Sequence, residues 1–185
     1  MQQNLIWFLR ILIVIQSLGY AAKLAAPSAL NSYLLGSMGE SLVSGLDHTA
    51  WLFLLFASVT LLVLGFLRPA VSSVLGKVDL ALLGLLALWP FTLAVFSWLN
   101  NLGDAFHATD PIGHAVRFAA PLALVILSFN PKQLWQTRVD WLLRLSVAGA
   151  FIGHGLCAWW IKPSFIDLIV GTLDTILGQD LAASA

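Results

Sequence analysis

The residues best suited to chemistry lie inside stretches that are otherwise apolar. His154 stands between two glycines in the segment FIGHGLCAWW, and Arg117 opens the segment RFAAPLALVIL. An ionisable side chain inside a bilayer is costly, about 2.5–3.5 kcal/mol for Arg at a helix centre, so such residues tend to have a function. The candidate ligand-binding residues are His154, Arg117, Tyr20, Gly153, Gly155 and His114.

Two interpretations of His154 are open. A neutral imidazole avoids most of the cost of burial, but it needs a partner for each ring nitrogen. Gly153 and Gly155 would let another helix or a flat ligand approach closely, because they carry no side chain. Either the ring contacts a ligand, for instance through a hydrogen bond to a quinone carbonyl, or it makes an interhelical hydrogen bond that fixes packing.

Arg117 is harder to accommodate, because a guanidinium does not lose its proton in a protein. Its side chain either extends to the outer head groups, or pairs with Asp110 or Asp104, or binds an anionic or carbonyl group of a ligand. The other basic residues near helix ends are expected to be interfacial anchors, namely Arg10, Arg144 and Lys23.

Several other kinds of site find no support in the spacing of residues. The four histidines include no HxxxH or HExxH pair, so no metal site is predicted. Haem would need a second axial ligand in another span, which argues against it. Cys157 is the only cysteine, which excludes an internal disulfide and a CxxC motif. No nucleophile–base spacing or glycine-rich phosphate loop is present, so whether the chain is an enzyme stays open.

The composition is that of an integral membrane protein. Of the 185 residues, 59% are hydrophobic and 10% are charged, and the mean hydropathy is +0.90. Soluble domains carry about 25% charged residues. The net charge of zero gives no indication of nucleic-acid binding. We therefore expect one integral membrane domain over residues 1–185, with the lipid bilayer as its first partner.

A helix that crosses about 30 Å of hydrocarbon needs roughly 20 apolar residues. The segments that meet or approach this length are 5–26, 49–67, 80–99, 112–129 and 141–161. The sequence thus predicts an all-α, polytopic membrane helical bundle with about five transmembrane helices. The fourth segment carries Arg117 and Pro121, so three alternatives are open: it is tilted, it is re-entrant, or it is shielded by its neighbours.

The distribution of basic residues predicts the orientation. With five spans, six basic residues fall on the side of the N-terminus, namely Arg10, Arg68, Lys77, Lys132, Arg138 and Arg144. Three fall on the other side, namely Lys23, Arg117 and Lys162. The positive-inside rule then places the N-terminus in the cytoplasm and the C-terminus outside the cytoplasmic (inner) membrane.

The C-terminal residues differ from the spans. Apolar residues recur at helical spacing over 164–181, while Asp167 and Asp174 lie on another face, and Ser164 is suited to cap the start. We expect an amphipathic helix on the outer surface.

The first and fifth spans resemble each other, because Arg10 and Arg144 each precede a glycine by nine residues, with a Pro-Ser pair further on. Either these spans are structural equivalents, each followed outside by a Pro-Ser-capped helix, or the match is one that apolar sequences reach by chance.

The stretch LRLSVAGAFIGHGL resembles the first-helix pattern of DoxX-like membrane proteins, and RFAAPLALVIL is similar to an Arg-then-Pro-Leu segment in a later helix of some relatives. The matching positions are Arg144, Gly153, His154, Gly155, Arg117 and Pro121. The order differs from the family, because the better copy of the first helix comes last here. The resemblance implies a small helical bundle in the cytoplasmic membrane. It also implies an association with redox chemistry, since some DoxX-like proteins are linked to quinone-dependent sulfur oxidation or redox stress.

Two functions follow from these observations. The first is a redox-associated protein that binds a quinone or a lipid in a pocket in the outer half of the bundle. The second is a non-catalytic structural or assembly subunit of a larger membrane complex, which the short loops favour because they leave little protein outside the bilayer to carry out chemistry.

Overall fold

The chain folds into a bundle of helices. The structure, a computed structural model, describes residues 2–24, 26–67, 70, 73–129, 133–160, 167, 169–173 and 175. No strand occurs among them, which confirms the all-helical prediction. The helices are α1 (Gln2–Lys23), α2 (Ala29–Leu34), α3 (Glu40–Leu67), α4 (Val74–Asn100), α5 (Ala105–Ala108), α6 (Asp110–Gly113), α7 (Ala115–Phe129) and α8 (Gln133–Trp159).

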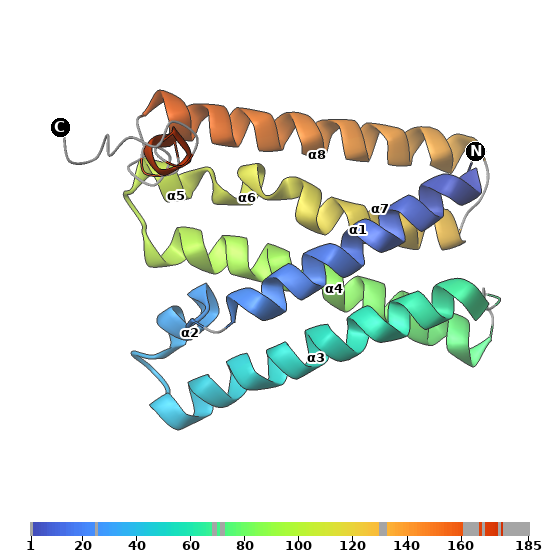
Figure 1. Cartoon of the computed structure of the whole chain (residues 1–185), viewed down its shortest axis with the longest axis horizontal. Helices are drawn as coiled ribbons and strands as arrows, with labels where there is room; N and C mark the ends of the chain where they lie inside the picture. Colours follow the sequence, from blue (N-terminus) through green and yellow to red (C-terminus); the bar gives the residue numbers. More distant parts are fainter. Residues whose placement is uncertain are drawn as a thin grey trace.

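Four of these helices, α1, α3, α4 and α8, are long and apolar enough to cross a membrane. They run along the long axis of the molecule, and α7 lies among them (Figure 1). The short helices α2, α5 and α6 gather at one end of the bundle, which we call the cavity end, and the chain begins at the opposite end (Figure 1). Of the five predicted spans, four therefore correspond to helices of spanning length, and the fourth in order corresponds to the shorter α7.

Helix boundaries differ from the predicted spans mainly at the polar flanks. The second span was predicted from residue 49 and the fifth from 141, but α3 begins at Glu40 and α8 at Gln133. Hydropathy marks only the apolar part of a helix, whereas backbone hydrogen bonding continues into polar residues until a cap ends it. The predicted C-terminal helix at 164–181 lies mostly outside the described residues, and those described there, 167, 169–173 and 175, are helical.

The fourth predicted span, 112–129, is divided in the structure. The turn at Thr109 separates α5 from α6, and Pro111 lies in the first turn of α6, where its missing N–H costs nothing. His114 then closes α6 with a non-helical backbone before α7 begins at Ala115. The chain therefore reaches α7 through two short helices with polar side chains, which is how polar groups come to line the cavity end.

The short helix α7 is central to the packing. It contacts α1, α4 and α8, while α1 also packs along α3. The residues with less than 2% exposure include Ile13 on α1, Leu54 and Leu61 on α3, Leu83 on α4, and Leu124 on α7. By contrast, only 17% of the most apolar 18-residue stretch of α8 is buried, against 33–39% of the corresponding stretches of the other three long helices. The helix α8 is therefore attached to the bundle along one side only.

A buried ion pair ties three helices together at the end opposite the cavity. Arg10 on α1 donates from both terminal nitrogens to Asp79 on α4, at 2.7 Å each, and Nη1 also donates to the backbone carbonyl of Leu61 on α3 at 3.0 Å. Gly65 leaves the space for this guanidinium, because an added Cβ there would lie 2.7 Å from Arg10 Cδ. The prediction that Arg10 is an interfacial anchor is therefore wrong, since the residue is only 6% exposed.

A second buried carboxylate fixes the start of α2 at the cavity end. Asp47 on α3 accepts hydrogen bonds from the backbone N–H of Ser28 at 3.0 Å, from Ser28 Oγ at 2.6 Å and from Asn31 Nδ2 at 2.9 Å. Ser28 in turn caps α2 by accepting from the backbone N–H of Asn31. The predicted Pro-Ser-capped helix after the first span is thus confirmed for α2, whereas its counterpart at Ser164 lies outside the described residues.

We expect Arg10→Met to lower the free energy of unfolding by about 3–5 kcal/mol, because the Asp79 carboxylate is left buried without its partner. The double variant Arg10→Met/Asp79→Leu should recover most of this loss, since removing both charges of a buried pair is often neutral. Unfolding in detergent would be followed by circular dichroism. Arg144→Met is the matched control, because Arg144 is exposed. A single Arg10→Met variant as stable as that control would contradict a structural role for the pair.

Candidate functional site

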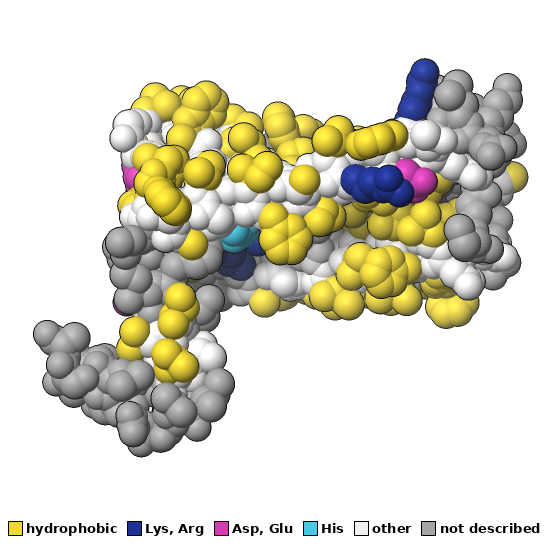
Figure 2. Space-filling view, turned by 90° about the horizontal axis from the view of Figure 1, so that it is seen from above, with side chains coloured by type: hydrophobic (Ala, Val, Ile, Leu, Met, Phe, Trp, Pro, Cys, Tyr) yellow, Lys and Arg dark blue, Asp and Glu magenta, His cyan; other side chains and the backbone are white. Residues whose placement is uncertain are grey.

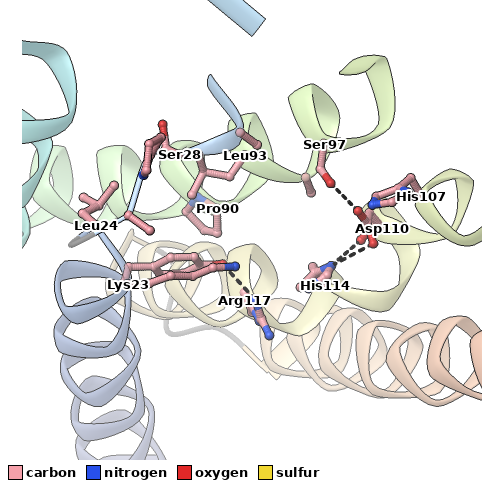
Figure 3. A pocket seen from close by; sticks show the side chains of 15 residues that line it. Lys23, Leu24, Ser28, Pro90, Leu93, Ser97, His107, Asp110, His114 and Arg117 are labelled. Atoms are coloured by element: carbon pink, nitrogen blue, oxygen red, sulfur yellow. Dashed lines mark hydrogen bonds and ion pairs between the residues drawn. The ribbon is translucent and has the colours of Figure 1, made fainter. Parts of the chain in front are cut away.

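A cavity of about 350 Å³ lies at the cavity end, between the end of α1, the start of α2, the second half of α4 and the segment α5–α7 (Figure 3). Its polar lining is formed by Tyr20, Lys23, Ser28, Ser97, His107, Asp110, His114 and Arg117. Apolar side chains close the rest, including Leu24, which directly follows α1, and Pro90, Leu93 and Ala94 on α4. The volume falls in the usual range for sites that hold small molecules or cofactors, about 300–1,000 Å³.

Arg117 is held against α1 at the edge of this cavity. Its Nη1 lies 3.3 Å from Tyr20 Oη, and its Cζ lies 5.8 Å from the centre of the Tyr20 ring. No carboxylate lies within 4.0 Å of the guanidinium among the described residues. Of the three alternatives for Arg117, the structure therefore contradicts pairing with Asp110 or Asp104. The positive charge of Arg117 faces a polar cavity, and no described carboxylate is in contact with it.

Both carboxylates expected for Arg117 are bound elsewhere. Asp110 accepts from Ser97 Oγ on α4 at 2.5 Å, and Asp104 lies 2.6 Å from Nδ1 of His107. These contacts join the segment before α7 to α4 and orient His107 along the cavity wall (Figure 3). Sequence reasoning did not select Lys23, Ser97, His107 or Asp110 as site residues. The spacing of Asp104 to His107 and of Asp110 to His114, one helical turn in each case, could have indicated His107 and Asp110.

His114 presents an acceptor nitrogen to the site. It lies in the turn between α6 and α7, outside the helices of spanning length, and its Nδ1 is 2.8 Å from the backbone carbonyl of Asp110. Since a carbonyl oxygen only accepts, Nδ1 carries the proton. With the proton on Nδ1, the Nε2 lone pair of the neutral ring is an acceptor.

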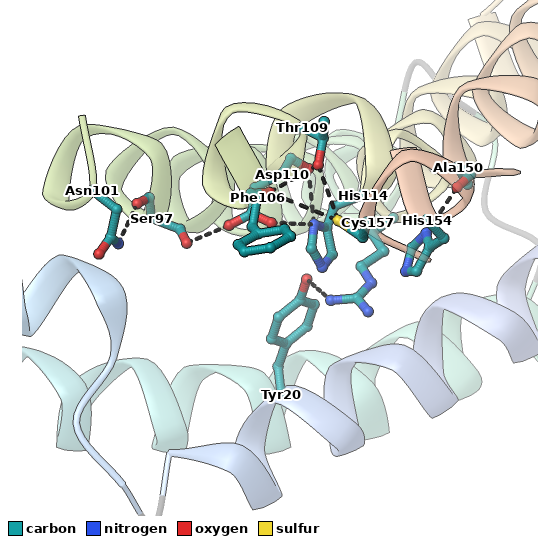
Figure 4. Close-up of polar contacts among 11 residues, drawn as sticks. Tyr20, Ser97, Asn101, Phe106, Thr109, Asp110, His114, Ala150, His154 and Cys157 are labelled. Atoms are coloured by element: carbon teal, nitrogen blue, oxygen red, sulfur yellow. Dashed lines mark hydrogen bonds and ion pairs between the residues drawn. The ribbon is translucent and has the colours of Figure 1, made fainter. Parts of the chain in front are cut away.

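His154 lies beside this group but does not line the cavity. Its Nδ1 is 2.7 Å from the carbonyl of Ala150 in its own helix, and its ring centre is 6.0 Å from that of His114 (Figure 4). The helices that carry Arg117 and His154, α7 and α8, pack together. The structure thus brings Tyr20, Arg117 and His114 to one cavity and places His154 at an exposed position next to His114.

The two glycines around His154 have different surroundings. A Cβ added to Gly153 would lie 2.6 Å from Cα and 2.7 Å from N of Gly113, so α8 and α6 cross here backbone to backbone. A Cβ added to Gly155 would meet nothing within 4 Å. The close approach that was expected at both glycines therefore occurs at Gly153 only, and it is made by a helix of the same chain.

Among the described residues, no three His, Cys, Asp or Glu side chains gather in a group that could hold a metal ion. The single thiol, Cys157, is buried beside Thr109, with Sγ 3.3 Å from Oγ1.

Comparison of the chain with models of protein families, with characterised proteins and with solved structures finds no match. The residues of the cavity themselves therefore carry the functional argument.

We expect the glycine pair to respond oppositely to alanine. Gly153→Ala should destabilise the protein by about 1–3 kcal/mol, because the extra methyl group overpacks the contact with Gly113. Gly155→Ala should be neutral or stabilising by up to about 1 kcal/mol, because the site is open and alanine favours helix. Thermal unfolding of both variants in the same detergent tests this. Equal destabilisation by the two substitutions would show that the backbone contact of α6 with α8 does not hold these helices together.

Proposed function

We propose that this chain is an integral membrane protein that binds the oxygen-bearing head group of an amphipathic ligand, a quinone or a lipid, in the cavity at the cavity end. The observation that carries the proposal is Arg117, whose guanidinium faces the cavity beside Tyr20 with no carboxylate in contact among the described residues. A fixed positive charge in such a place favours a ligand oxygen that is anionic or a carbonyl.

The remaining lining suits the same ligand. Lys23 adds a second positive charge at the rim, and the neutral His114 offers an acceptor for a ligand hydroxyl. Leu24, Pro90 and Leu93 provide an apolar wall for the rest of a ring or glycerol group. On the face seen in Figure 2, histidine and Lys or Arg atoms lie together, bordered by hydrophobic side chains. A ligand dissolved in the bilayer would meet this polar group from the side.

The resemblance to DoxX-like proteins supports a quinone over a phospholipid and an association with redox chemistry. The protein would bind or deliver the ligand for a partner enzyme in the same membrane.

A second candidate is a structural or assembly subunit of a larger membrane complex. The observation in its favour is the low burial of α8. Only 17% of its apolar stretch is buried, against 33–39% in the other long helices. Phe151, Ile152 and Trp159 are exposed on this helix, so α8 offers an apolar surface that either lipid or another subunit would cover.

We further propose a five-pass topology, with α7 as the fourth crossing, the N-terminus in the cytoplasm and the C-terminus outside the inner membrane. This follows from the excess of basic residues on the N-terminal side. A reporter active only in the cytoplasm should function when fused at the N-terminus or near Lys132, and should be silent after Ala185. A cytoplasmic C-terminus would require an even number of crossings and would contradict the five-pass topology.

For the ligand, we expect protein purified in mild detergent to retain quinone or phospholipid at up to one molecule per chain. Arg117→Gln should lose most of it, because a hydrogen bond to a charged group contributes about 1.5–3 kcal/mol, a factor of ten or more in affinity. Extraction followed by mass spectrometry identifies the ligand and separates the two sources. Arg144→Gln is the matched control and should retain it.

Each outcome of this experiment has a clear meaning. A retained quinone that Arg117→Gln loses supports a quinone site, and a retained phospholipid with the same behaviour supports a lipid site. An Arg117→Gln variant with full occupancy, or a wild type that binds neither class, overturns the binding function. A fixed set of co-purifying membrane proteins with no ligand would favour the subunit function.

A further inference from the structure

A polar side chain in the middle of α1 bonds to the backbone of α7. Gln16 Nε2 donates to the carbonyl oxygen of Arg117 at 2.7 Å. In a regular helix this carbonyl would accept from the N–H of the residue four positions later, which here is Pro121 and has no N–H. In a membrane, a carbonyl released by proline is satisfied by a neighbouring helix. Gln16 therefore supplies the donor that Pro121 removes.

The same face of α1 also holds the side chain of Arg117. Tyr20 lies four residues after Gln16, so the two side chains project from one face of the helix. Gln16 binds the Arg117 carbonyl at 2.7 Å, and the Arg117 guanidinium donates to Tyr20 Oη at 3.3 Å. One residue of α7 is thus held at its backbone and at the tip of its side chain by two positions one turn apart on α1.

We infer that Gln16 is the positioning residue for Arg117: by occupying the carbonyl released by Pro121, it sets the position of α1 along α7 at which the guanidinium reaches Tyr20 and the cavity. This inference rests on the proposed binding of a quinone or lipid head group by Arg117. Gln16 does not line the cavity, so it acts through Arg117 and not by contact with the ligand.

A purely structural role for Gln16 makes a different prediction. If Gln16 only satisfied a buried carbonyl, then Pro121→Ala would make it dispensable, because alanine restores the N–H within α7. The double variant Gln16→Leu/Pro121→Ala should therefore fold as stably as Pro121→Ala alone. If Gln16 positions Arg117, the double variant should still bind ligand poorly, because the link between α1 and the backbone of Arg117 is gone.

The experiment compares wild type, Pro121→Ala and Gln16→Leu/Pro121→Ala, each as the full chain in mild detergent. The probes are decylubiquinone, titrated by quenching of tryptophan fluorescence, and retained phospholipid, counted by mass spectrometry. We expect Pro121→Ala to bind within about threefold of wild type. The double variant should lose at least about tenfold in affinity, as for the loss of a hydrogen bond to a charged group, with its unfolding temperature unchanged relative to Pro121→Ala. Binding by the double variant equal to that of Pro121→Ala would overturn the inference.

A second measurement separates this inference from the proposed function. In protein with ¹⁵N-labelled arginine, the Arg117 side-chain resonance, identified by its loss in Arg117→Lys, should shift in the double variant and stay in place in Pro121→Ala. If wild type binds neither probe, the proposed function fails, while this shift still tests the positioning. An unchanged resonance rejects Gln16 as the positioning residue whatever the ligand. Should the double variant not fold, Gln16→Asn, which keeps the amide but shortens the side chain, gives the same comparison.

Discussion

The arrangement of this bundle depends on one constraint, which is that polar backbone groups in an apolar environment must find partners inside the protein. Pro121 breaks this rule within α7 by leaving the Arg117 carbonyl without its helical donor, and Gln16 restores it from α1 at 2.7 Å. Because α7 contacts α1, α4 and α8, a hydrogen bond that fixes the position of α7 affects the packing of all three helices. A helix of 15 residues that is too short to span a bilayer on its own is thereby held at the centre of the bundle.

Charged groups inside the bundle follow the same constraint but with different outcomes at its two ends. Opposite the cavity, Arg10 and Asp79 neutralise each other in a bidentate pair, and the Leu61 carbonyl takes up a further donor hydrogen. At the cavity end, Asp47 is satisfied by neutral donors from Ser28 and Asn31, while Arg117 has a hydroxyl and an aromatic ring as its described partners. At the first end the two charges neutralise each other, whereas at the cavity end the positive charge of Arg117 borders a cavity of about 350 Å³.

Much of the fold could be predicted from the sequence, because apolar periodicity and length are sufficient to identify the long helices. The sequence also indicated that Tyr20, Arg117 and His114 belong together, since each lies at the same end of its apolar segment. The role of Arg10 was not predictable in this way. Its position near a helix end suggested an interfacial anchor. Only the fold shows that Gly65 leaves space for the Arg10 side chain, and that Asp79, which is 69 residues further along the chain, lies next to it. The partner of Gln16 was hidden for the same reason, because the need for a donor arises in another helix.

The surroundings of His154 could not be predicted from the sequence either. His154 and its glycines form the most conspicuous motif, yet Gly153 serves the contact with Gly113, and the imidazole bonds within its own helix. The close crossing of α6 on α8 has a consequence for the cavity, because it fixes the turn that carries His114 and the start of α7 that carries Arg117. If Gly153 were larger, α6 would move away from α8 toward α4, where Asp110 binds Ser97, and the polar lining would be displaced with it. The motif therefore shapes the site through packing, and the predicted site residues that line the cavity are Tyr20, His114 and Arg117.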